Sequence, residues 1–194
     1  MKSMRILFTG VGGQGTLLAS RLLGEAAMAQ GMEVKISEVH GMAQRGGVVE
    51  STVMLGGIES PIISEGQANI MVSFEPLETL RALNRCNRDT AIITNITPVI
   101  PFTVKLGQSE YPDISQWMDF VSTQFKMVYA FDAESLAREA GTSKAVNIVL
   151  LGTLIGTGRV PISADIIENT IREKVKPGFV DANLKAFELG LQQA

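Results

Sequence analysis

The sequence predicts an α/β fold: a mainly parallel, Rossmann-like wound sheet with an antiparallel hairpin excursion and a helical C-terminus. Three observations support this prediction. The short apolar segment Arg5–Phe8 runs into the glycine-rich stretch GVGGQG and then into a helical pattern. Apolar segments of strand length then alternate with helical patterns along the middle of the chain. From residue 144 onwards the apolar residues recur at helical spacing.

The first unit of the chain is expected to be a strand, a glycine loop, a helix and a second strand. Leu18, Leu22 and Ala26 recur at intervals of four residues in the helical pattern. We therefore expect these three side chains to share the helix face that packs against the sheet. Gly31 ends this helix, and Glu33–Val39 is expected to form the second strand.

The next segment interrupts the alternation of strands and helices. The loop GMAQRGG is followed by the extended run VVESTVML, and then by Gly56 and Gly57. Two glycines between extended segments are typical of a hairpin, because the favoured turns need positive φ angles. We therefore expect an antiparallel hairpin at this glycine pair, with a further extended stretch after it.

Strand and helix patterns alternate again beyond this excursion. The expected strands are Ile70–Phe74, Ala91–Thr94 and Met127–Phe131. Pro76 suits the first turn of a helix, where its missing N–H is not needed. Asp132 can cap the helix that follows the last strand, and Gly141 is expected to end it. The proline-containing stretch 95–113 is expected to be an irregular connection.

The C-terminal part is expected to contain helices only. The segment NIVLLGTLIG is apolar on nearly all sides and is too short for a membrane span, so it predicts a buried helix. Asn147 at its start is expected to be a buried, hydrogen-bonded residue. Ser163 is a plausible N-cap for the next helix. Apolar positions at helical spacing in the last two helices are Ile167, Ile171, Val175, Val180, Leu184, Phe187 and Leu191.

Composition restricts the possible functions. A chain of 194 residues is long enough to bury its own core, and we expect one domain over residues 1–194. The net charge is −3 and no stripe of Lys and Arg is present, so we expect no binding of nucleic acid. The sequence has no apolar run long enough for a membrane span and no secretory pattern at its start, MKSMRILFTG. A cytoplasmic location without membrane contact is therefore expected.

The chain contains one cysteine, Cys86, and one histidine, His40. A single thiol can neither form an internal disulfide nor supply the set of thiolates that holds an iron–sulfur cluster. One cysteine and one histidine also fall short of the usual ligands of a zinc ion. We therefore expect no metal site on this chain.

The loop GVGGQG is the first candidate binding site. It fits the pattern G-x-G-x-x-G, follows an expected strand and opens an expected helix. Glycines let a ligand approach the backbone, and the free N–H groups at a helix start favour an anion. The candidate binding residues here are Gly10, Gly12, Gly13, Gln14, Gly15 and Thr16.

This loop has three competing interpretations. A phosphate-binding P-loop needs a lysine before the hydroxyl residue, and Gln14-Gly15-Thr16 has none, which argues against a nucleoside triphosphatase. A dinucleotide site for NAD or FAD needs an acidic residue at the end of the second strand, and Glu38 is close to that place. Alternatively, the glycines serve only the tight packing of strand and helix.

The second candidate is the loop HGMAQRGG, which begins at His40. Arg45 lies between Gln44 and the small residues Gly46 and Gly47, which leave its guanidinium accessible to a phosphate or carboxylate. A hydrogen-bonded histidine at a strand end and a solvated loop arginine are the alternatives. If the second strand lies beside the first, both loops emerge at the same carboxyl edge, where open α/β sheets bind ligands.

Together, GVGGQG and SEVHGMAQRGG resemble the paired loops of γ-type subunits of 2-oxoacid:ferredoxin oxidoreductases. EGQANIMVSFEPLETLRAL and NIVLLGTLIG also match the family's order of elements, so the resemblance covers essentially the whole chain. Members that act on pyruvate or 2-oxoglutarate more often carry Tyr-Gly-Pro-Glu-x-Arg-Gly-Gly at the second loop. The form His-Gly-Met-x-Gln-Arg-Gly-Gly at 40–47 is more similar to the small subunit of indolepyruvate oxidoreductases, which favours an aryl-pyruvate over pyruvate.

The resemblance implies a function that depends on a partner. In this family thiamine diphosphate with magnesium attacks the 2-oxoacid, carbon dioxide leaves, electrons pass through iron–sulfur clusters to ferredoxin, and coenzyme A takes the acyl group. This chain has neither the cysteines nor a visible thiamine-binding signature. The resemblance therefore implies a hetero-oligomer in which a larger subunit carries these cofactors, while this chain, inactive alone, serves coenzyme A access and subunit docking.

Within this interpretation Gly10–Thr16 and Gln44–Gly47 receive the phosphates of coenzyme A or dock the partner, and no catalytic residue is assigned. His40 is not expected to be an obligatory base, because thiamine chemistry can use its own aminopyrimidine. Met42 is a candidate for an adaptable interface. Two alternatives stay open: a stand-alone Rossmann-like domain whose Glu38 contacts the ribose of a nucleotide, and a purely structural subunit.

Overall fold

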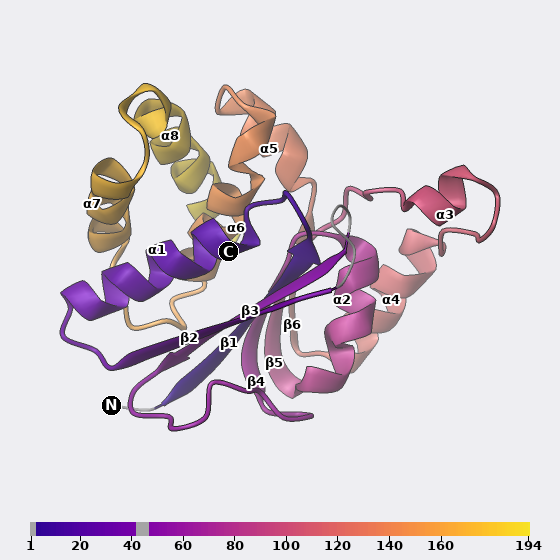
Figure 1. Cartoon of the computed structure of the whole chain (residues 1–194), viewed down its shortest axis with the longest axis horizontal. Coiled ribbons are helices and arrows are strands. Elements are labelled where there is room, and N and C mark those ends of the chain that lie inside the picture. Colours follow the sequence, from indigo (N-terminus) through magenta and orange to yellow (C-terminus); the bar gives the residue numbers. More distant parts are fainter. Residues whose placement is uncertain (1–2, 42–46) are drawn as a thin grey trace.

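The computed structural model describes residues 3–41 and 47–194, which contain a six-stranded mixed sheet (Figure 1). Its strands are β1 (Met4–Val11), β2 (Val34–His40), β3 (Val48–Leu55), β4 (Ala68–Ser73), β5 (Cys86–Asn95) and β6 (Met127–Phe131). The strand order is β2-β3-β1-β4-β5-β6, with β1, β4, β5 and β6 parallel and β3 antiparallel to both of its neighbours. The predicted α/β class, with a mainly parallel sheet and an antiparallel part, is confirmed.

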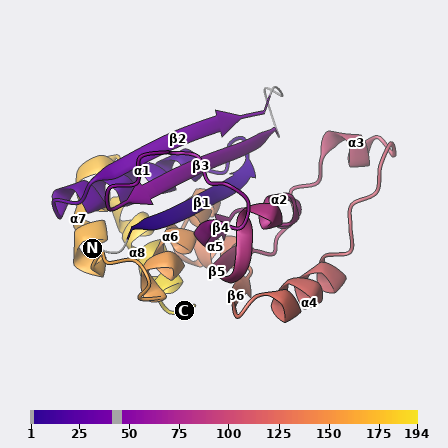
Figure 2. The same ribbon diagram turned by 90° about the horizontal axis from the view of Figure 1, so that it is seen from below.

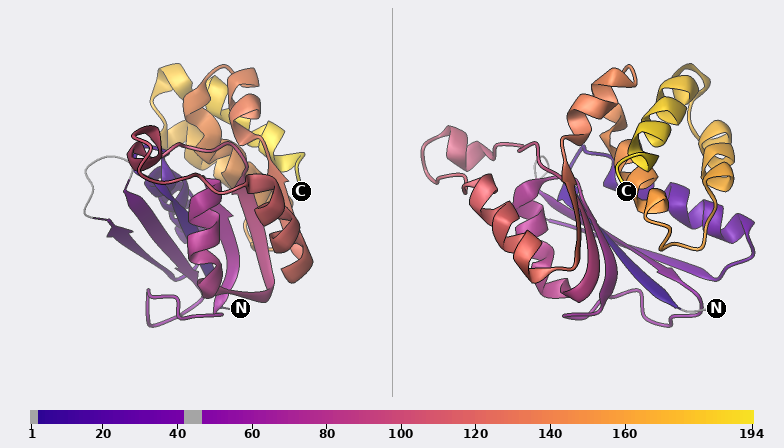
Figure 3. Two further views of the ribbon diagram at one scale, coloured as in Figure 1. Left: turned by 90° about the vertical axis from the view of Figure 1, so that its right-hand side faces the viewer. Right: turned by 180° about the vertical axis from the view of Figure 1, so that it is seen from behind.

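Helices lie on both sides of this sheet (Figure 3). One side is covered by α1 (Thr16–Ala29), α5 (Ala133–Glu139), α6 (Val146–Gly156), α7 (Ala164–Lys174) and α8 (Val180–Leu191). The other side carries α2 (Pro76–Ala82) and α4 (Ile114–Gln124), and the short α3 (Phe102–Lys105) lies in the connection before α4. Three 3₁₀ turns, η1 (Leu83–Arg85), η2 (Ser143–Ala145) and η3 (Pro177–Phe179), complete the described elements.

β1 is apolar because helices cover both faces of the sheet at this strand. Ile6 and Phe8 are fully buried against the side that carries α1 and α6, while Leu7 is buried on the side of α2 and α4. Successive side chains of a strand point to opposite faces, so a strand covered on both faces is apolar at every position. The continuous run Arg5–Phe8 therefore predicted a central strand correctly.

Most element ends follow the predicted local chemistry. Pro76 occupies the first turn of α2, and the buried Glu75 caps that helix by accepting hydrogen bonds from the backbone N–H groups of Leu77 and Glu78 at 2.7 and 3.1 Å. Asp132 accepts a hydrogen bond from the N–H of Ser135 at 3.0 Å, and Gly141 follows α5 with a φ of 111°. Ser163 occupies the N-cap position of α7, although its side chain makes no capping hydrogen bond.

The predicted antiparallel hairpin exists, but it is formed by the consecutive strands β2 and β3, and its predicted turn at Gly56-Gly57 is wrong. β3 pairs with β2 on one side and with β1 on the other. Gly56 and Gly57, with φ angles of 82° and 76°, end β3, and no strand forms within 58–67. The edge of β1 that faces away from β3 is paired with β4, so no place beside β1 is left for a further strand. Pro61 and Gly66 in this stretch also do not favour a strand.

The predicted buried face of α1 is wrong at Leu18. Leu22 and Ala26 are buried, but Leu18 is 40% exposed. Each step of four residues rotates a position by about 40° around a helix, so Leu18 is displaced by about 80° from Ala26. The face against the sheet is centred on Ala19, Leu22, Leu23 and Ala26.

The C-terminal helices are confirmed, and α6 and α8 pack with their backbones in contact. A Cβ atom added at Gly152 would lie 2.2 Å from the carbonyl oxygen of Phe187, and one at Gly190 would lie 2.0 Å from that of Val149. The hydroxyl of Thr153 also donates a hydrogen bond to the Gly190 carbonyl at 3.0 Å. Glycine is therefore required at this crossing because of space. In the described residues no helix is long and apolar enough to cross a membrane.

We predict that Gly152→Ala lowers the free energy of unfolding by about 1–3 kcal/mol, because the added methyl group forces α6 away from α8. Urea unfolding of the purified chain measures this change. Gly178→Ala is the matched control, because a Cβ atom at Gly178 meets nothing within 4 Å. Equal unfolding midpoints for the two variants would contradict the close packing.

Candidate functional site

The two predicted loops lie side by side. β1 and β2 are both antiparallel to β3, so their carboxyl ends point to the same edge of the sheet. The N–H of Gly12 in the first loop donates a hydrogen bond to the carbonyl of Gly47 in the second loop at 2.9 Å. The condition for a shared edge, that the second strand lies beside the first, is not met, because β3 separates them. The shared edge is nevertheless present, because β3 runs antiparallel to both β1 and β2, which are therefore parallel to each other.

The second loop is described at its two ends. Met42, Gln44, Arg45 and Gly46 lie outside the described residues. The two ends of the loop are described, and the N–H of Gly41 donates a hydrogen bond to the carbonyl of Val48 at 2.8 Å. The segment that contains Arg45 therefore begins and ends next to the first loop.

The side chain of Gln14 holds the first loop in shape. Its amide oxygen accepts a hydrogen bond from the N–H of Val11 at 2.8 Å, and its amide nitrogen donates one to the carbonyl of Phe74 at 3.0 Å. Gly13 and Gly15 have φ angles of 99° and 81°, which favour glycine. The Gln14 side chain thus stabilises the conformation of the loop, because both ends of its amide are hydrogen-bonded to backbone groups.

The start of α1 is open to an anion. Gly15 is its N-cap and has no side chain to accept hydrogen bonds from the N–H groups of the first turn. Thr16 is 2% exposed, and its hydroxyl has no hydrogen-bond partner among the described residues. The first turn also carries no acidic side chain that would repel an anion. An uncapped helix N-terminus with a buried free hydroxyl is a suitable environment for a phosphate.

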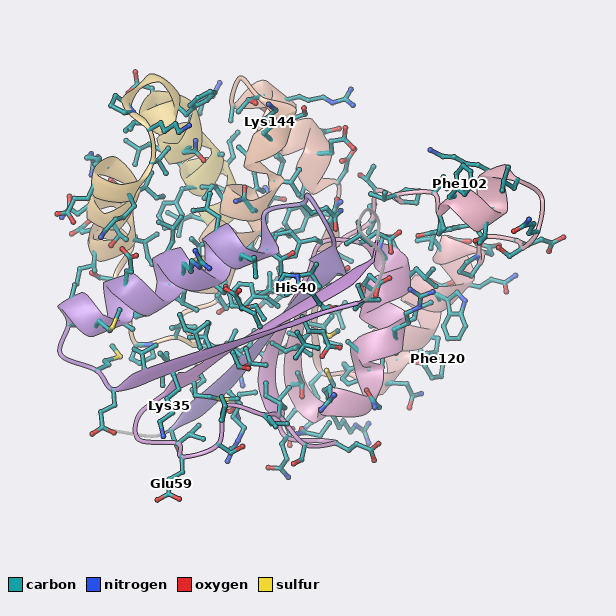
Figure 4. The ribbon with its side chains drawn as sticks, in the orientation of Figure 1. Lys35, His40, Glu59, Phe102, Phe120 and Lys144 are labelled. Atoms are coloured by element: carbon teal, nitrogen blue, oxygen red, sulfur yellow. The ribbon has the colours of Figure 1, made fainter. Side chains whose placement is uncertain are left out.

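A hollow of about 530 Å³ lies over this helix start. It is lined by Val11, Gly12, Gly13, Gly15, Thr16, Leu17, Leu18, Arg21, His40 and Val49. The hollow thus includes most of the first loop and the last residue of β2, and it excludes the side chain of Gln14. In Figure 4 the start of α1 lies between Lys144 above and His40 below.

Glu38 links the two basic side chains of this hollow. One of its carboxylate oxygens accepts a hydrogen bond from Arg21 at 3.3 Å, and the other lies 3.8 Å from Nε2 of His40. The side chains of Arg21 and His40 are 62% and 52% exposed, so both can also reach a ligand. Glu38 is on an edge strand that β3 separates from β1, which is not the adjacent position of a dinucleotide site.

Two further hollows extend from the first around Leu18. One, of about 400 Å³, is lined by the other side of the glycine loop, by Thr97 and Val99, and by Lys144. The next, of about 310 Å³, is lined by Lys144, Lys174 and Lys176 and by the half-exposed ring of Phe179. Leu18 lines all three hollows, so its exposed side chain lies at the centre of one continuous surface.

The lysines on this surface differ in whether a carboxylate of the chain already pairs with them. Lys174 forms an ion pair with Glu25 at 2.9 Å, and this contact raises the pKa of Lys174. Lys144 and Lys176 form no ion pair within the described part of the chain. Sequence reasoning did not select Arg21 or Lys144, because a lone basic residue in a helical stretch has no distinguishing pattern.

Asn147 joins α6 to the glycine loop. It is 3% exposed and donates a hydrogen bond to the carbonyl of Gly15 at 3.4 Å, which confirms the predicted buried, hydrogen-bonded residue. A Cβ atom at Gly15 would lie 2.7 Å from the side-chain amide nitrogen of Asn147. The glycine is therefore needed both for its φ angle and for this contact.

Comparison with known proteins identifies the family. The family model for pyruvate ferredoxin/flavodoxin oxidoreductase matches residues 5–193. The chain belongs to this family. It is 42% identical to the indolepyruvate oxidoreductase subunits IorB of Pyrococcus horikoshii and of Thermococcus kodakarensis over 196 aligned residues, which cover 100% of this chain and 97% of each relative.

Among solved structures, the 2-oxoglutarate:ferredoxin oxidoreductase from Magnetococcus marinus has the same fold. Its TM-score is 0.74 at 18% identity, and the alignment covers 100% of this chain but 31% of that chain. This chain is thus a subunit of a 2-oxoacid:ferredoxin oxidoreductase complex, as its sequence resemblance implied. In Magnetococcus marinus the same fold occurs within a much longer polypeptide.

We predict that Gln14→Ala lowers the free energy of unfolding by about 1–3 kcal/mol, because it removes two hydrogen bonds to loop backbone groups. Urea unfolding measures the loss. Gln116→Ala, at an exposed position of α4, is the control and should leave the midpoint unchanged. A Gln14→Ala midpoint equal to that of the control would show that the loop does not need this side chain.

Proposed function

We propose that this chain is the non-cluster subunit of an indolepyruvate:ferredoxin oxidoreductase. The complex would convert indolepyruvate, or another aryl-pyruvate, and coenzyme A to an acyl-CoA and carbon dioxide, with ferredoxin as the electron acceptor. Support comes from the 42% identity to indolepyruvate oxidoreductase subunits over nearly their whole length, and from the second-loop sequence that begins at His40.

The partner subunit is proposed to carry thiamine diphosphate, magnesium and the iron–sulfur clusters. Thiamine diphosphate supplies the carbanion chemistry of decarboxylation, and the clusters carry single electrons. Cys86 is the single cysteine of this chain, and burial raises the pKa of its thiol to about 12. A thiol in that environment is not a ready thiolate ligand. We therefore propose that this chain itself binds coenzyme A and docks the partner subunit.

We infer that the glycine-loop edge receives coenzyme A. The observation that carries this proposal is the buried hydroxyl of Thr16, which has no hydrogen-bond partner among residues 3–41 and 47–194, at a helix start that lacks a side-chain cap there, beneath an open hollow of about 530 Å³. The diphosphate would bind the N–H groups of the helix start, with Arg21 and Arg45 supplying positive charge. The proposed binding residues remain those named from the sequence, Gly10–Thr16, Glu38, His40 and Gln44–Gly47. Gly12, Gly13, Gly15, Thr16 and His40 line the hollow, and Glu38 would orient Arg21 rather than touch the ligand.

The lysine-lined hollow beyond Leu18 suits the remaining phosphate of coenzyme A. Lys144 and Lys176 are unpaired within the described residues, and Phe179 offers a half-exposed aromatic ring. A purine ring stacks favourably on an aromatic side chain. An extended ligand with phosphates at two separated positions therefore matches this surface better than a single phosphate does. The solved Magnetococcus marinus enzyme of the same fold contains coenzyme A and succinyl-CoA.

A stand-alone dinucleotide-binding domain is the second candidate, because the strand, glycine loop and helix of Met4–Ala29 have the required order. The acidic residue of that interpretation, Glu38, is engaged by Arg21 and lies on an edge strand. Titration of the chain with NADH and FAD distinguishes the two candidates, since the coenzyme A proposal expects neither to bind.

We predict that Lys144→Ala weakens the binding of coenzyme A by about tenfold and leaves the binding of dephospho-coenzyme A, which lacks the 3′-phosphate, unchanged. The reason is that only the complete ligand would bring a phosphate to this lysine, and one lost charge-assisted contact corresponds to roughly 1.5–3 kcal/mol. Calorimetric titration of the purified complex measures both affinities.

Lys185→Ala, on the outer side of α8 where its amine donates to the carbonyl of Glu139, is the matched control. If wild type binds coenzyme A and dephospho-coenzyme A equally well, the lysine-lined hollow does not hold the 3′-phosphate. If neither ligand binds to the complex, the coenzyme A proposal itself is wrong.

We predict that Arg45→Ala in the assembled complex raises the KM for coenzyme A by at least about tenfold, while the KM for the 2-oxoacid stays the same. An arginine held against a phosphate contributes a charge-assisted, bidentate contact that alanine cannot replace. Steady-state kinetics with each substrate varied in turn measure the two constants. Unchanged coenzyme A affinity, turnover and assembly would remove Arg45 from the site.

The proposed substrate has its own test. The complex of this chain with the protein that co-purifies with it is expected to reduce ferredoxin with indolepyruvate and coenzyme A, and to do so with a higher kcat/KM than with pyruvate or 2-oxoglutarate. Ferredoxin reduction followed by absorbance gives the three values. A preference for pyruvate would place this chain with a different substrate group of the same family.

A further inference from the structure

The connection between β5 and β6 exposes apolar side chains, and apart from Val99 none of them lines the hollows around the glycine loop. We call residues 96–125 the apolar arm; it contains α3 and α4 and extends beyond the sheet (Figure 2). Its exposed large apolar residues are Ile96, Val99, Ile100, Phe102, Leu106, Trp117 and Phe120. Phe102 is the most exposed of these, at 72%, and Figure 4 shows it on the projecting α3. Exposed apolar groups gathered on one segment indicate an interaction surface, whereas scattered ones need no explanation.

Only one face of α4 is covered by the rest of the chain. Val121 is the single buried residue of this helix, and Met118 and Phe125 pack partly against the core cluster on the α2 side. Beside this covered face, Trp117 and Phe120 form an edge-to-face pair with ring centroids 5.9 Å apart and an interplanar angle of 89°. Both rings are more than a third exposed, at 39% and 47%. Aromatic side chains of this kind are enriched at the cores of protein interfaces.

The arm is held in place rather than loosely attached. The buried carboxylate of Glu75 accepts a hydrogen bond from the N–H of Val99 at 3.2 Å and another from the hydroxyl of Tyr111. Burial and the neighbouring Glu75 carboxylate raise the pKa of Tyr111, so this tyrosine remains a hydrogen-bond donor at neutral pH. The same Glu75 caps α2, so the arm is anchored to the start of α2 at two points, Val99 before α3 and Tyr111 between α3 and α4. A partner would meet a preformed surface.

The arm is continuous with the glycine-loop edge. It begins directly after Asn95, whose side chain donates a hydrogen bond to the Phe74 carbonyl that Gln14 also contacts. Thr97 and Val99, at the base of the arm, line the same hollow as Gly13 and Gly15. A polypeptide seated on the arm would therefore lie next to the open side of the proposed coenzyme A site.

We propose that the apolar arm is the docking surface for the larger, cofactor-bearing subunit of the complex. This inference rests on the proposed function. Over its whole length the chain is similar to a subunit of an oxidoreductase complex, so a partner chain of the same enzyme is the expected occupant of an exposed apolar surface. Docking at the arm brings the partner's cofactor towards the glycine-loop edge, whereas a second copy of this chain would bring no cofactor there.

The test compares Phe102→Glu and Phe120→Glu with a matched control. Each arm variant is expected to bind the larger subunit at least about tenfold more weakly than wild type, because a charge replaces an aromatic anchor. Met28→Glu is the control, because Met28 is 54% exposed on α1, away from the arm, and this variant should bind like wild type. Affinity is measured by biolayer interferometry with the immobilised larger subunit, and circular dichroism verifies the fold of every variant.

Unchanged affinity of both arm variants would overturn the proposal. So would a chain that dimerises alone through the arm, shown by analytical ultracentrifugation in which Phe102→Glu abolishes the dimer while partner binding is retained. Hydrogen exchange of the wild-type chain needs no variant: residues 96–125 are expected to gain protection on assembly, and no gain there would also overturn the proposal. Coenzyme A titration of the same variants, expected to match wild type, keeps a failure of the proposed function separate from a failure of docking.

Discussion

The hydrogen bond between the N–H of Gly12 and the carbonyl of Gly47 is the contact on which the arrangement of the site depends. It exists because β3 enters the sheet between β1 and β2 and runs against both. This placement brings the ends of two sequence-distant segments to one edge. The uncapped start of α1, the buried hydroxyl of Thr16 and the basic side chains of Arg21 and His40 then surround one hollow.

The architecture was largely predictable from the sequence because local rules and tertiary structure agree. Apolar runs marked the central strands, and Pro76, Asp132 and Gly141 marked helix ends by mechanisms that act within a few residues. The position of β3 was not predictable in this way. Periodicity reports which faces of a strand are buried, but it does not report which strands are neighbours. The glycine pair at 56–57 was therefore assigned to a hairpin when it only ends a strand.

Side chains of the candidate site were predictable only where they belong to a motif. The glycine loop and the residues from His40 to Gly47 stand out by composition. Arg21, Leu18 and Lys144 belong to no motif, and only the folded chain shows that they line the hollows around the glycine loop. Gln14 shows the opposite case, since a motif residue turned out to support the loop from within. Helix α4 was not anticipated, because a helix with Val121 as its single buried residue has no clear apolar stripe.

The contact between α6 and α8 has a consequence for how the protein is made. Asn147, at the start of α6, supports Gly15, and α6 is itself held by the glycine crossing with α8. The support beneath a loop made of residues 10–15 thus depends on a helix that ends at Leu191. During synthesis α8 leaves the ribosome after both the glycine loop and α6, so the support beneath this loop is incomplete until residues 180–191 have emerged. The glycine-loop edge therefore reaches its final packing much later in synthesis than its own residues are made.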